Sequence, residues 1–179
     1  MIRNRKRTSL TNYKKRIAQL KSNSKRLVVR KSNRAIAMQV IEYERNGDKI
    51  LASVNSRELK ALGWEPRCNI PTAYLTGMLL ASKLKDKAEE YILDIGLYRP
   101  VKSSVIFAAA KGFKDNGANL NSNIEFDEKR LSGEHIAKYA ADAKDEVYKA
   151  QFSDYIKNNF DAKEIIVKFD ALKKQIMSK

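Results

Sequence analysis

The stretch RLVVRKSNRAIAMQVIEYERNGDKILASV, residues 26–54, decides the fold. Three runs within it are rich in β-branched and apolar residues, as is typical of strands, and they cover 26–31, 35–43 and 49–54. Ser32-Asn33 separates the first two runs as a tight turn, and Asn46-Gly47 favours a type I′ hairpin turn before the third. The stretch therefore predicts a meander of three antiparallel strands.

Helices and strands alternate after the meander. The pattern predicts a short helix at 56–62, a helix at 72–87, a strand at 91–97 and a helix that starts after Ser103 or Ser104 and stops at Gly117. The strand is apolar on both faces apart from Asp94, as a central strand would be. A fifth strand, indicated only weakly, follows near 118–126. The order predicts an α/β fold of three layers, with a mixed five-stranded sheet arranged as in ribonuclease H.

The chain is expected to be helical from about Asp127 to its end. Aromatic residues of one face and apolar residues of another recur at helical spacing, namely Tyr148, Phe152 and Tyr155, then Ile165, Phe169, Leu172 and Ile176. This part of the chain is nearly neutral, so its aromatic stripe is interpreted as a packing surface rather than a base-stacking platform. Three regions result: a basic arm (1–25), an α/β domain (26–126) and a helical C-terminal extension (127–179).

Positive charge is concentrated at one end of the chain. The net charge is +15, and 13 of the 36 Lys and Arg residues lie in positions 1–34, whereas the first acid is Glu42. The other 145 residues hold 23 bases against 21 acids. Such a segment repels itself until a polyanion neutralises it. A solvated tail that serves solubility is the weaker explanation, because acids are excluded so strictly.

Nucleic acid is the polyanion that the sequence favours over a membrane or an acidic protein. No apolar run approaches the ~20 residues that span a bilayer, and the arm lacks the features of a signal peptide. Residues 12–21 follow helical spacing, with a thin apolar stripe that anchors poorly in lipid and Lys14, Lys15 and Lys21 on the other faces.

Basic residues continue into the first hairpin turn. The turn from Arg30 to Arg34 supplies two guanidinium groups, an ammonium, a hydroxyl and an amide, the groups that hold phosphate and ribose oxygens. Strand alternation places Leu27 and Val29 on one face of the first strand, and Arg26 with Arg30 on the other.

A second candidate site follows the strand at 91–97. After Gly96 come Tyr98, Arg99 and Lys102, ahead of a serine-capped helix whose free N–H groups favour anions. Tyr98 either stacks on a base or covers the core. Arg57, on the short helix, is a further candidate, although such residues are ordinary exposed charges by default.

Catalysis and metal binding find little support. Cys68 and His135 are the single cysteine and histidine, so neither a disulfide nor a thiolate–imidazole zinc site can form within one chain. A two-metal nuclease needs several converging carboxylates, but the strand at 26–31 has none and Asp94 is alone on its strand. The sequence predicts no cofactor, metal or small-molecule substrate, and an RNA-processing enzyme remains the weaker alternative.

Several longer motifs resemble a known family. RLVVRKSNR, IEYERNGDKILASVNSRELKALGW, NIPTAYLTGMLLASK, YILDIGLYRPVKSSVIFAAAKG and RLSGEHIAKYA occur in the order and spacing of the archaeal and eukaryotic form of large-subunit ribosomal protein eighteen. The resemblance covers about residues 3–150. It implies a structural RNA-binding protein of the cytoplasmic ribosome, without catalysis and with a ribonuclease H-like domain that lacks the catalytic acids.

The partners implied by the resemblance are 5S rRNA, the 23S-type large-subunit rRNA and neighbouring ribosomal proteins of the central protuberance. The family's RNA-contacting regions correspond to Arg3, Arg5, Lys6, Arg7, Tyr13, Lys14, Lys15 and Arg16 in the arm, to Arg30, Lys31, Ser32, Asn33 and Arg34 in the turn, and to Arg99 and Lys102. Lys21, Lys25, Arg26, Arg57 and Tyr98 complete the predicted rRNA-binding set. A general nucleic-acid compactor, which does not select its target, stays open as an alternative.

Overall fold

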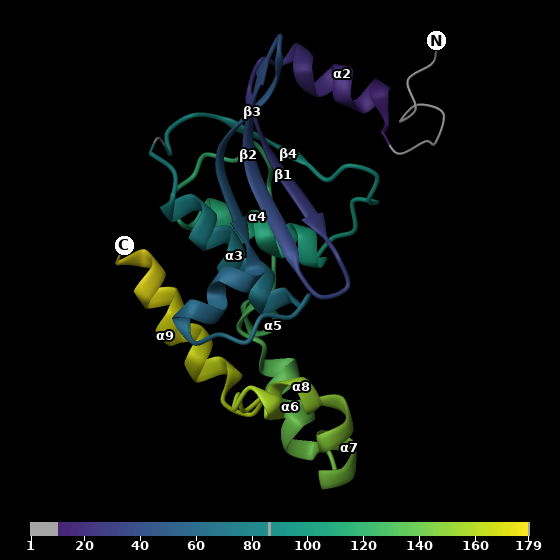
Figure 1. Ribbon diagram of the computed structural model, residues 1–179, viewed down its shortest axis with the longest axis vertical. Helices are drawn as coiled ribbons and strands as arrows, with labels where there is room; N and C mark the ends of the chain where they lie inside the picture. The colour runs from purple at the N-terminus through teal and green to yellow at the C-terminus, as the bar shows by residue number, and fades with distance from the viewer. Residues whose placement is uncertain (1–10, 86, 179) are drawn as a thin grey trace.

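The computed structural model describes residues 11–85 and 87–178, and its centre is a mixed, open sheet of four strands (Figure 1). The strands are β1 (Lys25–Lys31), β2 (Ile36–Glu44), β3 (Gly47–Asn55) and β4 (Tyr91–Asp94), in the order β3-β2-β1-β4. β1, β2 and β3 pair antiparallel, which confirms the predicted meander, whereas β4 runs parallel to β1.

The two hairpin turns differ in detail from the predicted ones. Glu44 pairs with Gly47, so Arg45 and Asn46 form the two-residue turn and Gly47 already belongs to β3. The first turn is a four-residue loop from Ser32 to Ala35, because Lys31 pairs with Ile36. In this loop the Ser32 hydroxyl accepts the N–H of Ala35 at 3.1 Å, and the Ser32 N–H donates to the Ala35 carbonyl at 2.8 Å.

The sheet corrects two predictions. It has four strands and not five, because the segment expected as the fifth makes only an isolated parallel bridge between Tyr91 and Leu120. Asn119 and Asn121 flank that bridge, and asparagine is disfavoured in strands. β4 therefore lies at the edge of the sheet rather than at its centre. β4 is apolar for two reasons. Leu93 packs against the core, and the segment around Leu120 adjoins the strand on its outer side.

The helices are placed as the alternating pattern predicts, with shifted bounds. They are α2 (Tyr13–Lys21), the 3₁₀ helix η1 (Ser56–Leu62), α3 (Ile70–Ser82), α4 (Val105–Asp115), α5 (Glu128–Ser132), α6 (Glu134–Asp142), α7 (Asp145–Gln151), α8 (Ser153–Lys157) and α9 (Ile165–Met177). The α/β class is thus confirmed. None of the helices in the described ranges is long and apolar enough to cross a bilayer.

α3 and α4 lie together on one face of the sheet (Figure 1). Every α3 residue from Ile70 to Ala81 is buried. The two helices cross at glycines: a Cβ on Gly77 would lie 2.0 Å from the Ala109 carbonyl oxygen, and one on Gly112 would lie 2.0 Å from that of Tyr74. Only residues without a side chain permit this approach, which holds the layer close against the core.

The hydrophobic core continues from the sheet into the C-terminal helices. Phe169 of α9 packs on Tyr74 of α3 with ring centroids 5.6 Å apart, and Phe160 meets Trp64 at 5.4 Å. Leu172 and the other members of the predicted α9 stripe are buried, as expected. The aromatic stripe of α7 and α8 also packs internally. Leu27 and Val29 of β1 belong to the core, so Arg26 lies on the sheet face opposite α3 and α4. Arg26 shares Asp48 with Arg16 of α2, so this is the face that α2 meets.

Candidate nucleic-acid interface

Helix α2 carries the basic arm onto that face. Asn12 caps it, since the Asn12 side chain accepts the N–H of Lys15 at 3.1 Å. The structure confirms the helix predicted for residues 12–21, but the apolar stripe of this helix is not buried against the core. No α2 residue is buried, and Ile17 is 54% exposed. The helix instead meets the sheet through polar side chains, among them Gln19, whose amide lies 3.4 Å from the Leu93 carbonyl oxygen.

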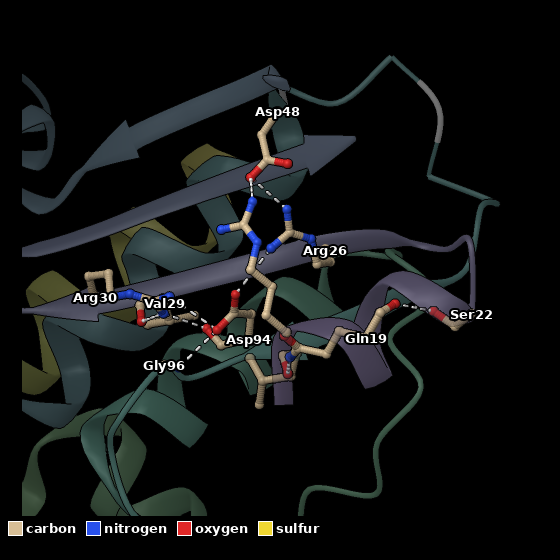
Figure 2. A network of polar contacts seen from close by, with 10 residues as sticks. Gln19, Ser22, Arg26, Val29, Arg30, Asp48, Asp94 and Gly96 are labelled. Carbon is tan, nitrogen blue, oxygen red and sulfur yellow. Dashed lines mark hydrogen bonds and ion pairs between the residues drawn. The ribbon is translucent and has the colours of Figure 1, made fainter. Parts of the chain in front are cut away.

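A chain of alternating charges connects α2 to three strands (Figure 2). Arg16 of α2 donates to Asp48 at 2.9 Å, and the same carboxylate oxygen lies 2.8 Å from Nη2 of Arg26. The contact between Arg26 and Asp48 is an ion pair without a hydrogen bond, since Arg26 Nη2 forms none with the described residues. Arg26 Nη1 then reaches Asp94 at 3.4 Å, and Asp94 pairs with Arg30 at 3.1 Å. Three guanidinium groups thus alternate with two carboxylates.

Asp94 is held at both carboxylate oxygens, because Oδ2 contacts Arg26 while Oδ1 contacts Arg30 and also accepts the N–H of Gly96 at 2.8 Å. Arg30 Nη1 donates to the Asp94 carbonyl oxygen at 2.7 Å and to that of Val29 at 2.9 Å. Gly96 has φ +63°, and a Cβ there would lie 3.0 Å from the Arg30 guanidinium carbon. Glycine therefore lets the loop close over Arg30, whose side chain remains 44% exposed.

A cleft of about 830 Å³ opens between α2 and the end of β4, lined by Thr11, Asn12, Lys15, Arg16, Arg26, Arg30 and the residues from Leu93 to Tyr98, among others. Tyr98 closes one side of it. The Tyr98 hydroxyl donates to the Lys31 carbonyl oxygen at 2.7 Å, and the Lys31 ammonium lies 5.6 Å from the ring centre. Tyr98 also packs against the core, so it joins the loop after β4 to the first hairpin.

The structure brings most of the predicted residues to the surface around this cleft and the neighbouring hairpin. Lys14, Lys15, Lys21, Arg30, Lys31, Ser32, Asn33, Arg34, Arg57, Arg99 and Lys102 are exposed, and Tyr13, Arg16, Lys25 and Tyr98 are partly exposed. Arg57 is the second residue of η1, which follows β3 directly. The last residue of β3 pairs near the start of β2, so Arg57 lies at the end of the sheet where the first hairpin turns. Arg3, Arg5, Lys6 and Arg7 lie outside the described residues.

Arg26 and Lys25 are engaged by acids of the protein itself, as Arg16 and Arg30 are. Arg26 is only 3% exposed, enclosed between Asp48 and Asp94, so its guanidinium is not presented to solvent as the hairpin pattern suggested. Lys25 forms an ion pair with Glu89, and the hydrogen bond between these side chains raises the pKa of the Lys25 ammonium.

Sequence analysis missed the two acids that organise the site. Asp94 had a readable signal, since it is the lone acid in an apolar strand and Arg26 and Arg30 share one face of the neighbouring strand. No sequence pattern points to Asp48, because its partners Arg26 and Arg16 lie 22 and 32 residues away in the chain. Within the two described ranges, no three His, Cys, Asp or Glu side chains gather as a metal site would require.

Comparisons with known proteins agree with the resemblance noted in the sequence. Residues 2–91 match the family described as "Ribosomal large subunit proteins 60S L5, and 50S L18". The "Large ribosomal subunit protein uL18" of Methanococcus maripaludis is 37% identical over 180 aligned residues, which cover 97% of this chain and 93% of that protein. A match over half of the chain, joined to a relative aligned along nearly all of it, establishes the relationship: the chain belongs to this family of ribosomal large-subunit proteins.

Proposed function

We propose that this protein binds 5S rRNA and helps attach it to the 23S-type rRNA at the central protuberance of the large subunit. Its role there is structural, without catalysis, and neighbouring ribosomal proteins complete the assembly. Family membership supports the coarser part of this proposal, because it places the chain in the large ribosomal subunit, in the cytoplasm, as a component of translation. We assign the α/β body to the ribonuclease H-like class, with the arm ending near residue 25 and the helical extension starting near 127.

The observation that carries the proposal is the convergence of three basic segments on one side of the sheet. α2, Arg30 of β1 and the start of the loop after β4 line the same cleft, and Tyr98 of that loop bonds to Lys31 at the first hairpin. Each of the three segments carries exposed cations. The deep, narrow major groove of A-form RNA keeps its base edges out of reach of side chains, so recognition rests mostly on phosphates, 2′-hydroxyls and shape. Cations fixed on a rigid sheet and a short helix suit that mode, since their spacing selects a backbone geometry.

The test uses two triple variants of equal charge. In the first, Lys14, Lys15 and Lys21 of α2 are replaced by Gln. In the control, three exposed lysines of the C-terminal helices, Lys149, Lys157 and Lys174, are replaced by Gln. Each lost phosphate contact lowers the slope of log affinity against log salt by about 0.7–0.9, so the α2 variant should lose about 2 units of slope. The control should keep the slope of the unaltered protein, and equal losses in both variants would refute the site.

Removal of the arm gives a larger effect. A chain that begins at Lys25 should keep its fold, with a circular dichroism spectrum that loses only the contribution of α2, because no residue of α2 is buried. If about six arm residues engage phosphate, the affinity of the unaltered protein for 5S rRNA should fall ~10³-fold between low and moderate salt. The shortened chain should lose most of its affinity and show a flatter dependence on salt. Unchanged binding by the shortened chain would overturn the proposal.

Competition separates this proposal from a general compactor. Transfer RNA or duplex DNA in large excess should displace little protein from labelled 5S rRNA. Equal displacement of the labelled RNA by unlabelled 5S rRNA, transfer RNA and duplex DNA at the same concentration would instead indicate a compactor without target choice. Magnesium-dependent cleavage of the bound RNA, abolished by Asp94→Asn, would indicate an enzyme.

A further inference from the structure

We propose that Asp48, an acidic residue, promotes RNA binding as a positioning residue: it holds α2 against the sheet in the free protein, so the arm cations are aligned before RNA arrives. This inference rests on the proposed function. It runs against simple charge counting, in which any acid lowers the affinity of a basic protein for RNA.

α2 has few other means of staying in place. A nine-residue helix is marginal in water on its own, so most of its stability must come from packing. Yet none of its residues is buried and Ile17 points largely into solvent. Besides the Arg16–Asp48 pair, the side-chain bond to the sheet is that of Gln19 to Leu93, which at 3.4 Å is long and therefore weak.

Asp48 is itself held in the geometry that this task requires. It lies in the β2–β3 hairpin, two residues beyond the turn, where it pairs with Tyr43. One carboxylate oxygen contacts Arg16 and Arg26 together, at 2.9 and 2.8 Å. Arg26 is almost fully buried and is fixed from its other side by Asp94. The carboxylate is thus clamped between a rigid guanidinium on β1 and a half-exposed one on α2.

The division of charges on α2 fits this role. Arg16, whose side chain is 38% exposed, faces the sheet and takes the carboxylate. Lys14, Lys15 and Lys21 are exposed and form no ion pair within the part of the chain that the structure describes. One cation is used to dock the helix, and its neighbours remain available for phosphate. Docking in advance reduces the ordering that binding would otherwise require.

The experiment compares Asp48→Asn with Glu44→Gln in the full chain. Both changes remove one negative charge from the same hairpin, but Glu44 is exposed, and its ion pair among the described residues is with Lys49 at 3.5 Å. We expect Asp48→Asn to weaken 5S rRNA binding about five-fold, the size of effect that a partly buried ion pair supports. Glu44→Gln should bind equally or slightly tighter. Asp48→Glu, which keeps the charge, should restore most of the affinity.

Hydrogen exchange of the free protein tests the docking step without RNA. The backbone amides of 13–21 should exchange several-fold faster in Asp48→Asn than in Glu44→Gln, while those of β1 and α3 stay protected. If Asp48→Asn does not fold, Arg16→Gln loosens the same pair from the helix side and should accelerate exchange in the same segment.

The outcomes distinguish the two proposals. Unaltered protein that fails to bind 5S rRNA refutes the proposed function, whereas fast exchange in Asp48→Asn would still establish docking by Asp48. If the unaltered protein binds, then equal or tighter binding by Asp48→Asn overturns the inference. Unchanged exchange of α2 in that variant overturns it as well.

Discussion

Asp94→Asn should be the most damaging single change in the charge network. Asp94 has a side chain only 12% exposed, and it faces Arg26, at 3.4 Å, and Arg30, at 3.1 Å. An asparagine oxygen can still accept the N–H of Gly96, but its amide would face guanidinium groups and cancel no charge. Loss of one partner from a buried ion pair costs about 3–5 kcal/mol. The lower end, about 3 kcal/mol, applies here because Arg26 keeps its contact with Asp48.

A double-mutant cycle measured by urea unfolding isolates this coupling. Asp94→Asn should lower the free energy of unfolding by about 3 kcal/mol, and the thermal midpoint should fall by roughly 6–12 °C for a chain of this size. In the Arg26→Met background the same change should cost about 1–2 kcal/mol less, because the most buried cation is gone. Asp170→Asn, at an exposed position of α9, is the matched control and should change little. A loss below about 1 kcal/mol, or additive effects in the cycle, would refute a stabilising network.

Three further predictions concern other parts of the molecule. Gly112→Ala should lower the free energy of unfolding by about 2 kcal/mol in urea melts, despite the better helix propensity of alanine, because the added Cβ meets a backbone carbonyl of α3 at 2.0 Å. Tyr98→Phe should cost about 1 kcal/mol in the same assay, since the Lys31 carbonyl loses its hydrogen bond from the hydroxyl. Partial burial lowers the pKa of His135, so the folded protein binds fewer protons than the unfolded chain near pH 6, and stability should fall as pH drops through that range. His135→Gln should flatten this dependence in melts at pH 5 and 7.5.

Local patterns predicted the helices and strands well wherever the spacing of apolar residues along the chain matches the face that is buried. β1, β2 and β3 match their expected runs, and α4 starts after Ser104 as predicted. The errors occur where a partner distant in sequence decides the outcome. β4 reads as a central strand because it is apolar, yet its position at the edge depends on whether the segment around Leu120 pairs for more than one residue. Strand periodicity carries no information about that pairing.

The candidate site was predictable by segment and not by side chain. Charge density correctly selected α2, the first hairpin and the loop after β4 as exposed basic segments, because exposure is the default for such residues. Alternation placed Arg26 on the same strand face as Arg30, which is right, but could not reveal that acids from two other strands enclose it. The RNA contacts and the division of the chain near residues 25 and 126 stay predictions.

The 13 Lys and Arg residues of positions 1–34 overstate the number of unpaired cations that an RNA ligand would meet. Arg16, Arg26 and Arg30 are matched by Asp48 and Asp94, so a phosphate that approaches them must compete with carboxylates already in place. The exposed lysines of α2 have no such competitors among the described residues. Each phosphate that one of these lysines neutralises therefore releases its condensed counterions in full. In this network the planar guanidinium groups assemble the surface, and the proposed function leaves the flexible ammonium groups of α2 to bind phosphate. The number of phosphate contacts taken from a salt slope should therefore follow the unpaired cations rather than the net charge.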